Sequence, residues 1–182
     1  MTDLVASELR RLHRKCAQLD RRLACANLPG KVASVDHDKR TLRLELGKDG
    51  EGKPILSPPV RWQQPGAGDF KMHAPPKVGE QMTLASPSGT MGSGSLAVWG
   101  TFDKDNAAPS KAADAAVMQF GNATITAKDG GLTLAVAGVS LALSSGGVAM
   151  AGGKVTHDSK DIGATHRHRG VERGSALTDP PA

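Results

Sequence analysis

A glycine-punctuated and almost uncharged stretch near the C-terminus places the strongest constraint on the fold. From Met118 to Gly153 the only charged residues are Lys128 and Asp129. Apolar residues alternate with small or polar ones in short runs, a pattern typical of β-strands, and turn-forming glycines separate the runs. The parity of the apolar positions changes across Gly138 and again across the glycine pair that follows. The pattern therefore predicts a series of short strands.

This stretch cannot complete a stable fold as a single copy. Its 36 residues have small side chains and a single aromatic one, Phe120, so they bury too little surface to be stable alone. A monomer would expose uncharged strand edges, which promote aggregation, and the Val/Leu alternation is unlike that of disordered segments. The sequence therefore predicts an oligomeric, fibrous shaft in which several copies share one core. The repeated strand–glycine units favour a β-solenoid type of shaft.

The first 26 residues carry a different periodicity. Residues 2–26 are predicted to form a helix whose apolar positions are spaced as in a coiled coil, with charges of both signs beside them. We expect the helix to stop at Pro29 and Gly30, where the chain would turn. Two interpretations remain open for this helix: self-association as a coiled coil, or packing on its own domain. The apolar positions are Val5, Leu9, Leu12, Cys16, Leu19 and Leu23.

Residues 31–103 predict a small β-domain. Five short segments alternate or run apolar and are separated by stretches rich in turn formers: "KVASVD", "TLRLEL", "PVRWQQ", "EQMTLASP" and "LAVWGTF". Five strands in this length fit a barrel of the OB type, and a small SH3-like barrel is compatible with the same spacing. Trp62 and Trp99 lie in strand contexts that predict internal positions. The small, polar segment that follows, with one proline, predicts a linker.

Charge and cysteines restrict the function classes. The net charge of +5 permits contact with nucleic acid but is a weak signal for it. Cys16 and Cys25 are nine positions apart, which places them on opposite sides of one helix, so we expect reduced thiols of a protein made in the cytosol. The N-terminus lacks the apolar core of a signal peptide, and no run is apolar for long enough to predict a membrane-spanning helix.

Two histidines stand near the C-terminus, in the sequence "IGATHRHRGV". In an extended strand, His166 and His168 would project from the same face. Two imidazoles provide at best half of the ligands of a metal site. The remaining ligands must come from elsewhere.

The order of these parts resembles the baseplate assembly protein V family, the central spikes of contractile phage tails and of related injection particles. The resemblance rests on "PPKVGEQMTLASPSG" in the β-domain and on the tail "KVTHDSKDIGATHRHRGVERGSALTDPP". It implies a mainly β homotrimer with an N-terminal helix, an OB-fold barrel, an intertwined triple-stranded β-helix and a metal-bound apex. The corresponding parts are a helix at 1–28 for a coiled coil or baseplate attachment, an OB-fold domain at 29–104, a linker at 105–117, a shaft at 118–154 and an apex at 155–182.

The resemblance also supplies the missing metal ligands. It implies one iron ion per trimer, bound on the threefold axis by His166 and His168 of three chains, and it allows further ions on that axis. Six imidazole nitrogens suit an octahedral Fe(II), Co(II) or Ni(II) site and disfavour zinc, and the family selects iron. A site with no open position would be structural. Thr156, His157 and Asp158 match neighbouring positions of the family without a ligand role being transferred to them.

The function that the resemblance implies is mechanical and non-enzymatic. The protein would be the central spike of a tail baseplate, or of a related contractile injection particle, and would pierce the host outer membrane when the sheath contracts. Its partners would be the tail tube or hub and other baseplate proteins, with assembly in the host cytoplasm. The alternative is an OB-fold protein that binds single-stranded nucleic acid by stacking bases on aromatic side chains. No pair of facing carboxylates or open zinc site points to an enzyme.

Overall fold

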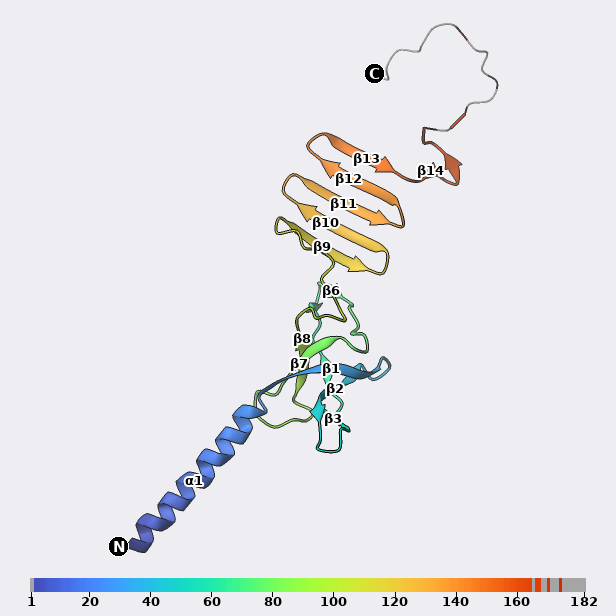
Figure 1. Ribbon diagram of the computed structural model, residues 1–182. Coiled ribbons are helices and arrows are strands. Elements are labelled where there is room, and N and C mark those ends of the chain that lie inside the picture. Colours follow the sequence, from blue (N-terminus) through green and yellow to red (C-terminus); the bar gives the residue numbers. More distant parts are fainter. Residues whose placement is uncertain (1, 165, 168–169, 171–173, 175–182) are drawn as a thin grey trace. The chain divides into compact units, whose positions relative to one another are not determined.

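The computed structural model describes residues 2–164, 166–167, 170 and 174 (Figure 1). The described residues are mainly β, with one helix at the N-terminal end. The chain divides into two compact units, Met1–Ala108 and Pro109–Ala182. The boundary lies within the segment that the sequence predicts as a linker. Each unit is described by itself below.

The first unit begins with α1 (Thr2–Ala24), whose last turn carries Arg21 and Arg22, the charge that favours a helix C-terminus. The helix ends two residues before the predicted limit. The turn predicted at Pro29 and Gly30 is wrong, because β1 (Asn27–Asp36) starts ahead of it and its first residues pair with β7 (Gln81–Ala85). Pro29 is tolerated there because β2 (Thr41–Lys48) pairs with β1 only from Lys31 onward, so the missing N–H leaves no ladder bond unmade.

The main sheet of this unit confirms the five predicted strand segments. Its six strands run in the order β3-β2-β1-β7-β8-β4, where β3 is Pro54–Leu56, β4 is Arg61–Trp62 and β8 is Leu96–Trp99. Strand β4 pairs with β8 in parallel, whereas the other pairs are antiparallel.

The predicted OB barrel is realised only in part. The residue before β4, Val60, exchanges two backbone hydrogen bonds with Leu42 of β2, at 2.8 and 3.0 Å. This single bridge brings the two sides of the sheet together without a continuous ladder. Among the described strands the sheet is thus OB-like, but it is not a fully closed barrel. A separate hairpin of β5 (Gly66–Ala67) and β6 (Lys71–Met72) interrupts the chain between β4 and β7.

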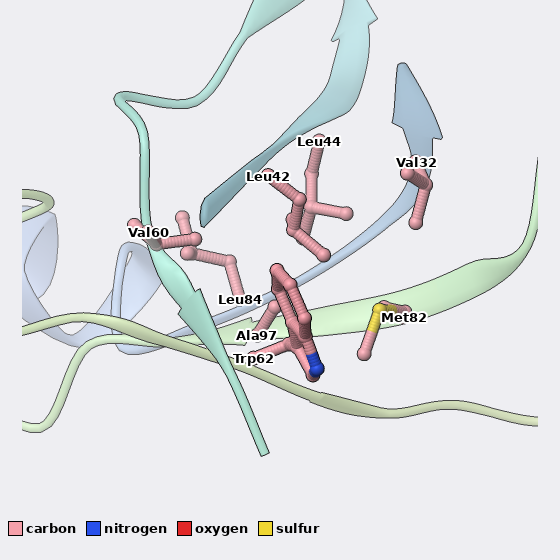
Figure 2. Packing of buried hydrophobic residues seen from close by; sticks show 8 residues of the cluster. All are labelled: Val32, Leu42, Leu44, Val60, Trp62, Met82, Leu84 and Ala97. Atoms are coloured by element: carbon pink, nitrogen blue, oxygen red, sulfur yellow. The ribbon is translucent and has the colours of Figure 1, made fainter. Parts of the chain in front are cut away.

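A compact core fills the interior of this sheet (Figure 2). Every second residue of β2 and β7 points inward, as expected for strands with one buried face. Ser57 is fully buried, and its hydroxyl accepts a hydrogen bond from Leu44 N and donates one to Pro58 O, so its burial leaves no polar group unsatisfied. The core residues are Val32, Leu42, Leu44, Val60, Trp62, Met82, Leu84 and Ala97.

The prediction that both tryptophans are internal holds for Trp62 alone. Trp62 is 5% exposed, whereas Trp99 is 45% exposed at the end of β8. Phe102, just beyond the strand, is also exposed. The apolar run "LAVWGTF" therefore extends beyond the end of β8, and its last aromatic residues are exposed.

The second unit is a single-layer meander of five antiparallel strands (Figure 1). The solenoid type expected from the sequence is not what the described strands form, because two-residue turns return the chain antiparallel instead of coiling it in one direction. A short hairpin of β14 (Thr156–His157) and β15 (Lys160–Asp161) follows. The meander strands are β9 (Ala115–Phe120), β10 (Ala123–Lys128), β11 (Gly131–Val136), β12 (Val139–Ser144) and β13 (Gly147–Ala151).

Candidate functional site: an uncovered apolar sheet face and a C-terminal histidine

The turns of the meander decide which side chains share a face. Each of the four connections contains two residues, and at Ala137 and Gly138 both have positive φ, 48° and 90°, as a type I′ hairpin requires. A two-residue turn pairs an even-numbered residue with an odd-numbered one. The parity change noted in the sequence therefore keeps the apolar residues on one face instead of switching them to the other.

The register confirms this geometry strand by strand. Residues directly opposite each other in an antiparallel pair point to the same face. One ladder crosses all five strands and contains Met118, Ile125, Leu134, Leu141 and Met150. Two flanking ladders on the same face add Ala116, Phe120, Ala123, Ala127, Leu132, Val136, Val139, Leu143 and Val148. Together these fourteen residues are called the apolar face below.

The apolar face is uncovered in the single chain. Phe120 is 86% exposed and Val148 63%, and Ile125 and Leu134 in the middle of the sheet are still about two-fifths exposed. An exposed, contiguous apolar surface of this kind marks an interaction site. The sequence indicated that this segment needed partners, but it did not show that a single continuous face would meet them.

The opposite face is built from small and hydroxyl-bearing side chains. Its central ladder contains Val117, Thr126, Thr133, Ala142 and Ala149. Lys128 lies at the margin of this face, and the neighbouring ladder includes Thr124 and Ser140. The sheet is therefore amphipathic, with one side suited to water and the other to a shared core.

Backbone contacts fix the end of the meander. Gly152 has φ +80°, and a Cβ atom at this position would collide with the carbonyl oxygen of Gly138 in the β11–β12 turn. The chain leaving β13 thus passes directly against that turn. Only glycine provides both the conformation and the space.

The C-terminal hairpin leads to His166. The two turn residues of the hairpin, Asp158 and Ser159, have φ of 45° and 64°. Asp161 Oδ1 accepts a hydrogen bond of 2.9 Å from Gly163 N, and Gly163 O accepts one of 3.1 Å from His166 N. His166 thus closes a turn, so the predicted extended strand at this position is wrong.

The orientation of His166 defines its tautomer. Its Nδ1 atom lies 2.6 Å from Gly163 O, and because a carbonyl oxygen can only accept, Nδ1 carries the proton. In the neutral ring the lone pair is then on Nε2, and this hydrogen-bonded arrangement is typical of metal-binding histidines. His168, the second predicted ligand, lies outside the described residues. His157 Nδ1 is 3.7 Å from Asp158 Oδ2 at the exposed hairpin turn.

One chain does not gather a metal site by itself in the part that the structure describes. Three or more His, Cys, Asp or Glu side chains do not converge among these residues. His166 fits one position of a histidine site, and the other donors would have to come from His168 and from further chains. The described part of the chain also contains no helix with the length and apolarity needed to span a bilayer.

An ion-pair cluster, which the sequence did not predict, ties the segment after β8 to β1. Lys31 Nζ lies 3.0 Å from Asp103 Oδ2 and also pairs with Asp105. Asn106 N and Asp105 N donate hydrogen bonds to Asp103 Oδ1, and the Asn106 side chain donates to Gly79 O. The ammonium of Lys31, aided by these donors, holds the pKa of Asp103 at about 2, below its ordinary value of 3.8.

This shift predicts an acid-sensitive attachment. Because the pKa of Asp103 is lower in the folded state, its stabilising contribution is complete above about pH 3.8 and is lost as the pH falls toward 2. Between pH 4 and pH 2, we expect the urea midpoint of the wild type to fall more than that of Asp103→Asn. Equal pH dependence of the two proteins would contradict a role for this carboxylate.

Comparison with known proteins places the first unit. Residues 28–100 match the family described as the type VI secretion system/phage-baseplate injector OB domain. This β-domain belongs to the injector OB-domain family. The match begins one residue after the start of β1 and ends one residue after β8, so it spans the OB-like sheet with its buried core. A search of curated proteins found no match to the chain.

The match of residues 28–100 confirms the resemblance that the sequence predicted for the β-domain. It supports a structural role in a baseplate or injector for this domain, in association with other baseplate components. It does not favour the nucleic-acid-binding alternative. The matched residues end before the meander and His166, so the roles of those two features have to be argued from their own geometry.

Proposed function

We propose that three copies of this injector protein assemble into the central spike of a contractile baseplate, with their apolar faces turned toward a common axis. The observation that carries the proposal is the apolar face itself, which extends over five strands and remains exposed in one chain. Its removal from water is the main driving force available for assembly. The number three comes from the family resemblance.

The hydrogen bonds of the meander determine how the copies would meet. The inner strands β10, β11 and β12 pair on both sides within the same chain. The backbone N–H and C=O groups of these strands are therefore already paired. Other copies of the chain would contact the face of the sheet more readily than insert strands between its own. Three such sheets packed around an axis would enclose a narrow core of Val, Leu, Ile, Met and Ala. Close packing of this kind would give the shaft its rigidity.

The apex is proposed to be fastened by one iron ion per trimer, held by His166 and His168 of each chain. The support is the tautomer of His166, which puts the ring lone pair on Nε2. A bound ion would link three chain ends that otherwise fray and would leave no position for substrate, so its contribution would be to stability. The family resemblance allows further ions on the axis.

In this proposal the protein acts mechanically and not as an enzyme. The spike would be attached to the tail tube or hub through its OB domain and other baseplate proteins, and sheath contraction would drive its tip through the host outer membrane. The particle would be assembled in the host cytoplasm, as part of a phage tail or of a related injection device. A shaft with an apolar interior and a small, polar exterior suits passage through a bilayer without refolding.

Mass and metal content together test this assignment. Light scattering of the purified protein should give three times the 18.8 kDa of one chain, and metal analysis should find about one transition-metal ion per three chains. His166→Ala should lose the metal and keep the trimeric mass, because the shaft assembles through its apolar face. A folded monomer would contradict the spike. A trimer without metal would contradict the fastened apex alone.

A further inference from the structure

An apolar stripe runs along α1 and is largely exposed, although at its C-terminal end Leu19 and Leu23 line a shallow groove with the loop at Pro87–Gly89. Counting from Val5, every fourth and third residue is apolar, and these side chains are between 48% and 76% exposed wherever they are leucine or valine. The stripe contains Val5, Leu9, Leu12, Cys16, Leu19 and Leu23 and is called the heptad stripe below. The function proposed above does not use it. Exposure of five aliphatic side chains along one helix indicates that something covers them.

The spacing of the heptad stripe corresponds to the a and d positions of a coiled coil. Leu9, Cys16 and Leu23 occupy the a positions, and Val5, Leu12 and Leu19 the d positions. The e and g positions beside this seam decide which helices can pair and in which direction. Glu8 and Lys15 are at g, and His13 and Asp20 are at e.

The charges at the e and g positions are complementary in a parallel arrangement of identical helices. In a parallel, in-register coiled coil, each g residue faces the e residue five positions later on the next helix. Lys15 then meets Asp20 of the neighbouring copy, and Glu8 meets His13. An antiparallel pair in the register that packs Cys16 against Leu12 would instead bring g against g. This places Lys15 against Lys15 and Glu8 against Arg22, whose side chain already donates to Ser88 O.

Contacts at the end of the helix leave Lys15 and Asp20 available, whereas Glu8 already pairs with Arg11 of its own helix. Arg22, the last g residue, donates from Nε to Ser88 O at 2.9 Å. Its e partner five positions later would be residue 27, which already belongs to β1. The attachment to the loop at Ser88 therefore uses a residue that the coiled coil does not require. Leu19 and Leu23 beside it remain 62% and 76% exposed.

We propose that the N-terminal helices of the assembled copies form a parallel, in-register coiled coil closed by the heptad stripe. The number of helices rests on the trimer of the proposed function. Cyclic symmetry supports the direction, because it places equivalent residues at the same height on the axis and excludes antiparallel helices. This coiled coil would hold the copies together at the N-terminal end independently of the shaft and its metal.

The chain contains its own probe for this arrangement. In a parallel coil the Cys16 side chains form one a layer, where neighbouring thiols come within disulfide distance. In an antiparallel pair an a residue packs against a d residue, so Cys16 would face Leu12. Cys25 lies outside the stripe and is half-buried. A disulfide between two Cys16 residues therefore reports both direction and register.

The experiment uses the full chain as Cys25→Ser, which retains only Cys16. Diamide, an oxidant that takes two electrons and two protons from a thiol pair, should convert up to about two thirds of the chains into covalent dimers, because each trimer holds an odd third thiol. The matched control Cys16→Ser, which keeps Cys25, should form few dimers. Asp20→Lys turns the three exposed Lys15–Asp20 pairs of the trimer into repulsive pairs and should slow cross-linking by roughly fivefold. Combining it with Lys15→Glu restores opposite charges and should restore the rate.

The outcomes separate this inference from the proposed function. Cross-linking through Cys16 in a protein of trimeric mass supports the coiled coil. A trimeric mass without Cys16 cross-links, or equal cross-linking through Cys25, overturns the coiled coil and leaves the spike in place. A monomeric mass overturns both.

Discussion

Replacement of Leu141 by aspartate is expected to abolish assembly of the protein. Leu141 lies in the ladder that crosses all five strands, with Leu134 on one side and Met150 on the other. In the proposed trimer its side chain is buried at the shared core. Three carboxylates would then be buried near one axis, each at a desolvation cost of several kcal/mol and with mutual repulsion. Light scattering should show monomers or aggregates.

The next residue provides the matched control for this substitution. Ala142 lies on the same strand but points to the opposite face, beside Thr133 and Ala149. Ala142→Asp adds the same charge one residue away and should keep the trimeric mass. If both variants assemble, the apolar face is not the interface. If both fail, the charge acts on the sheet and not on one of its faces.

Truncation of Leu44 is expected to strongly destabilise the OB domain. Leu44 is 0% exposed and lies in a core of only eight residues (Figure 2). Leu44→Ala should cost about 2–5 kcal/mol, the range for buried leucines that leave a cavity. Since domains of this size have only about 5–15 kcal/mol of stability, the loss is a large fraction of the total.

Urea denaturation monitored by tryptophan fluorescence measures this effect, because Trp62 lies in the same core. Leu56→Ala is the matched control: Leu56 belongs to the adjacent strand β3 but is 44% exposed, so its truncation should cost less than half as much. Similar midpoints for the two variants would show that the domain is not held together by this core.

The sequence predicted the elements of the fold better than their limits. All five strand segments of the OB domain are confirmed, because alternation over five or more residues is a strong local signal. Strand β3 was missed because three residues, Pro54–Leu56, are too few to show a period. The helix ends before the predicted limit and no turn forms at Pro29, because this proline joins the ladder with β7 where β1 has a single neighbouring strand.

For the candidate sites as well, the sequence predicted some features and not others. The prediction that the C-terminal stretch needs partners rests on composition, since so few small residues do not enclose a core by themselves. Composition did not predict that the apolar residues share one face, because this depends on the length of each turn and thus on the pairing between strands. The spacing of His166 and His168 makes His166 a candidate ligand, and this stays a prediction; its place in a turn depends on Gly163 O, which a motif does not reveal.

The equal spacing of the turns relates the length of the meander directly to its number of strands. The four turns begin at Gly121, Asp129, Ala137 and Ser145, so each strand with its turn occupies eight residues. One such module advances the stack by about 4.8 Å and reverses the chain. Insertion or deletion of two modules, sixteen residues, would change the reach of the tip by about 10 Å while returning the chain to the same side of the sheet. In the proposed spike, the depth of penetration could therefore change through duplication of hairpins, without changes to either end of the shaft.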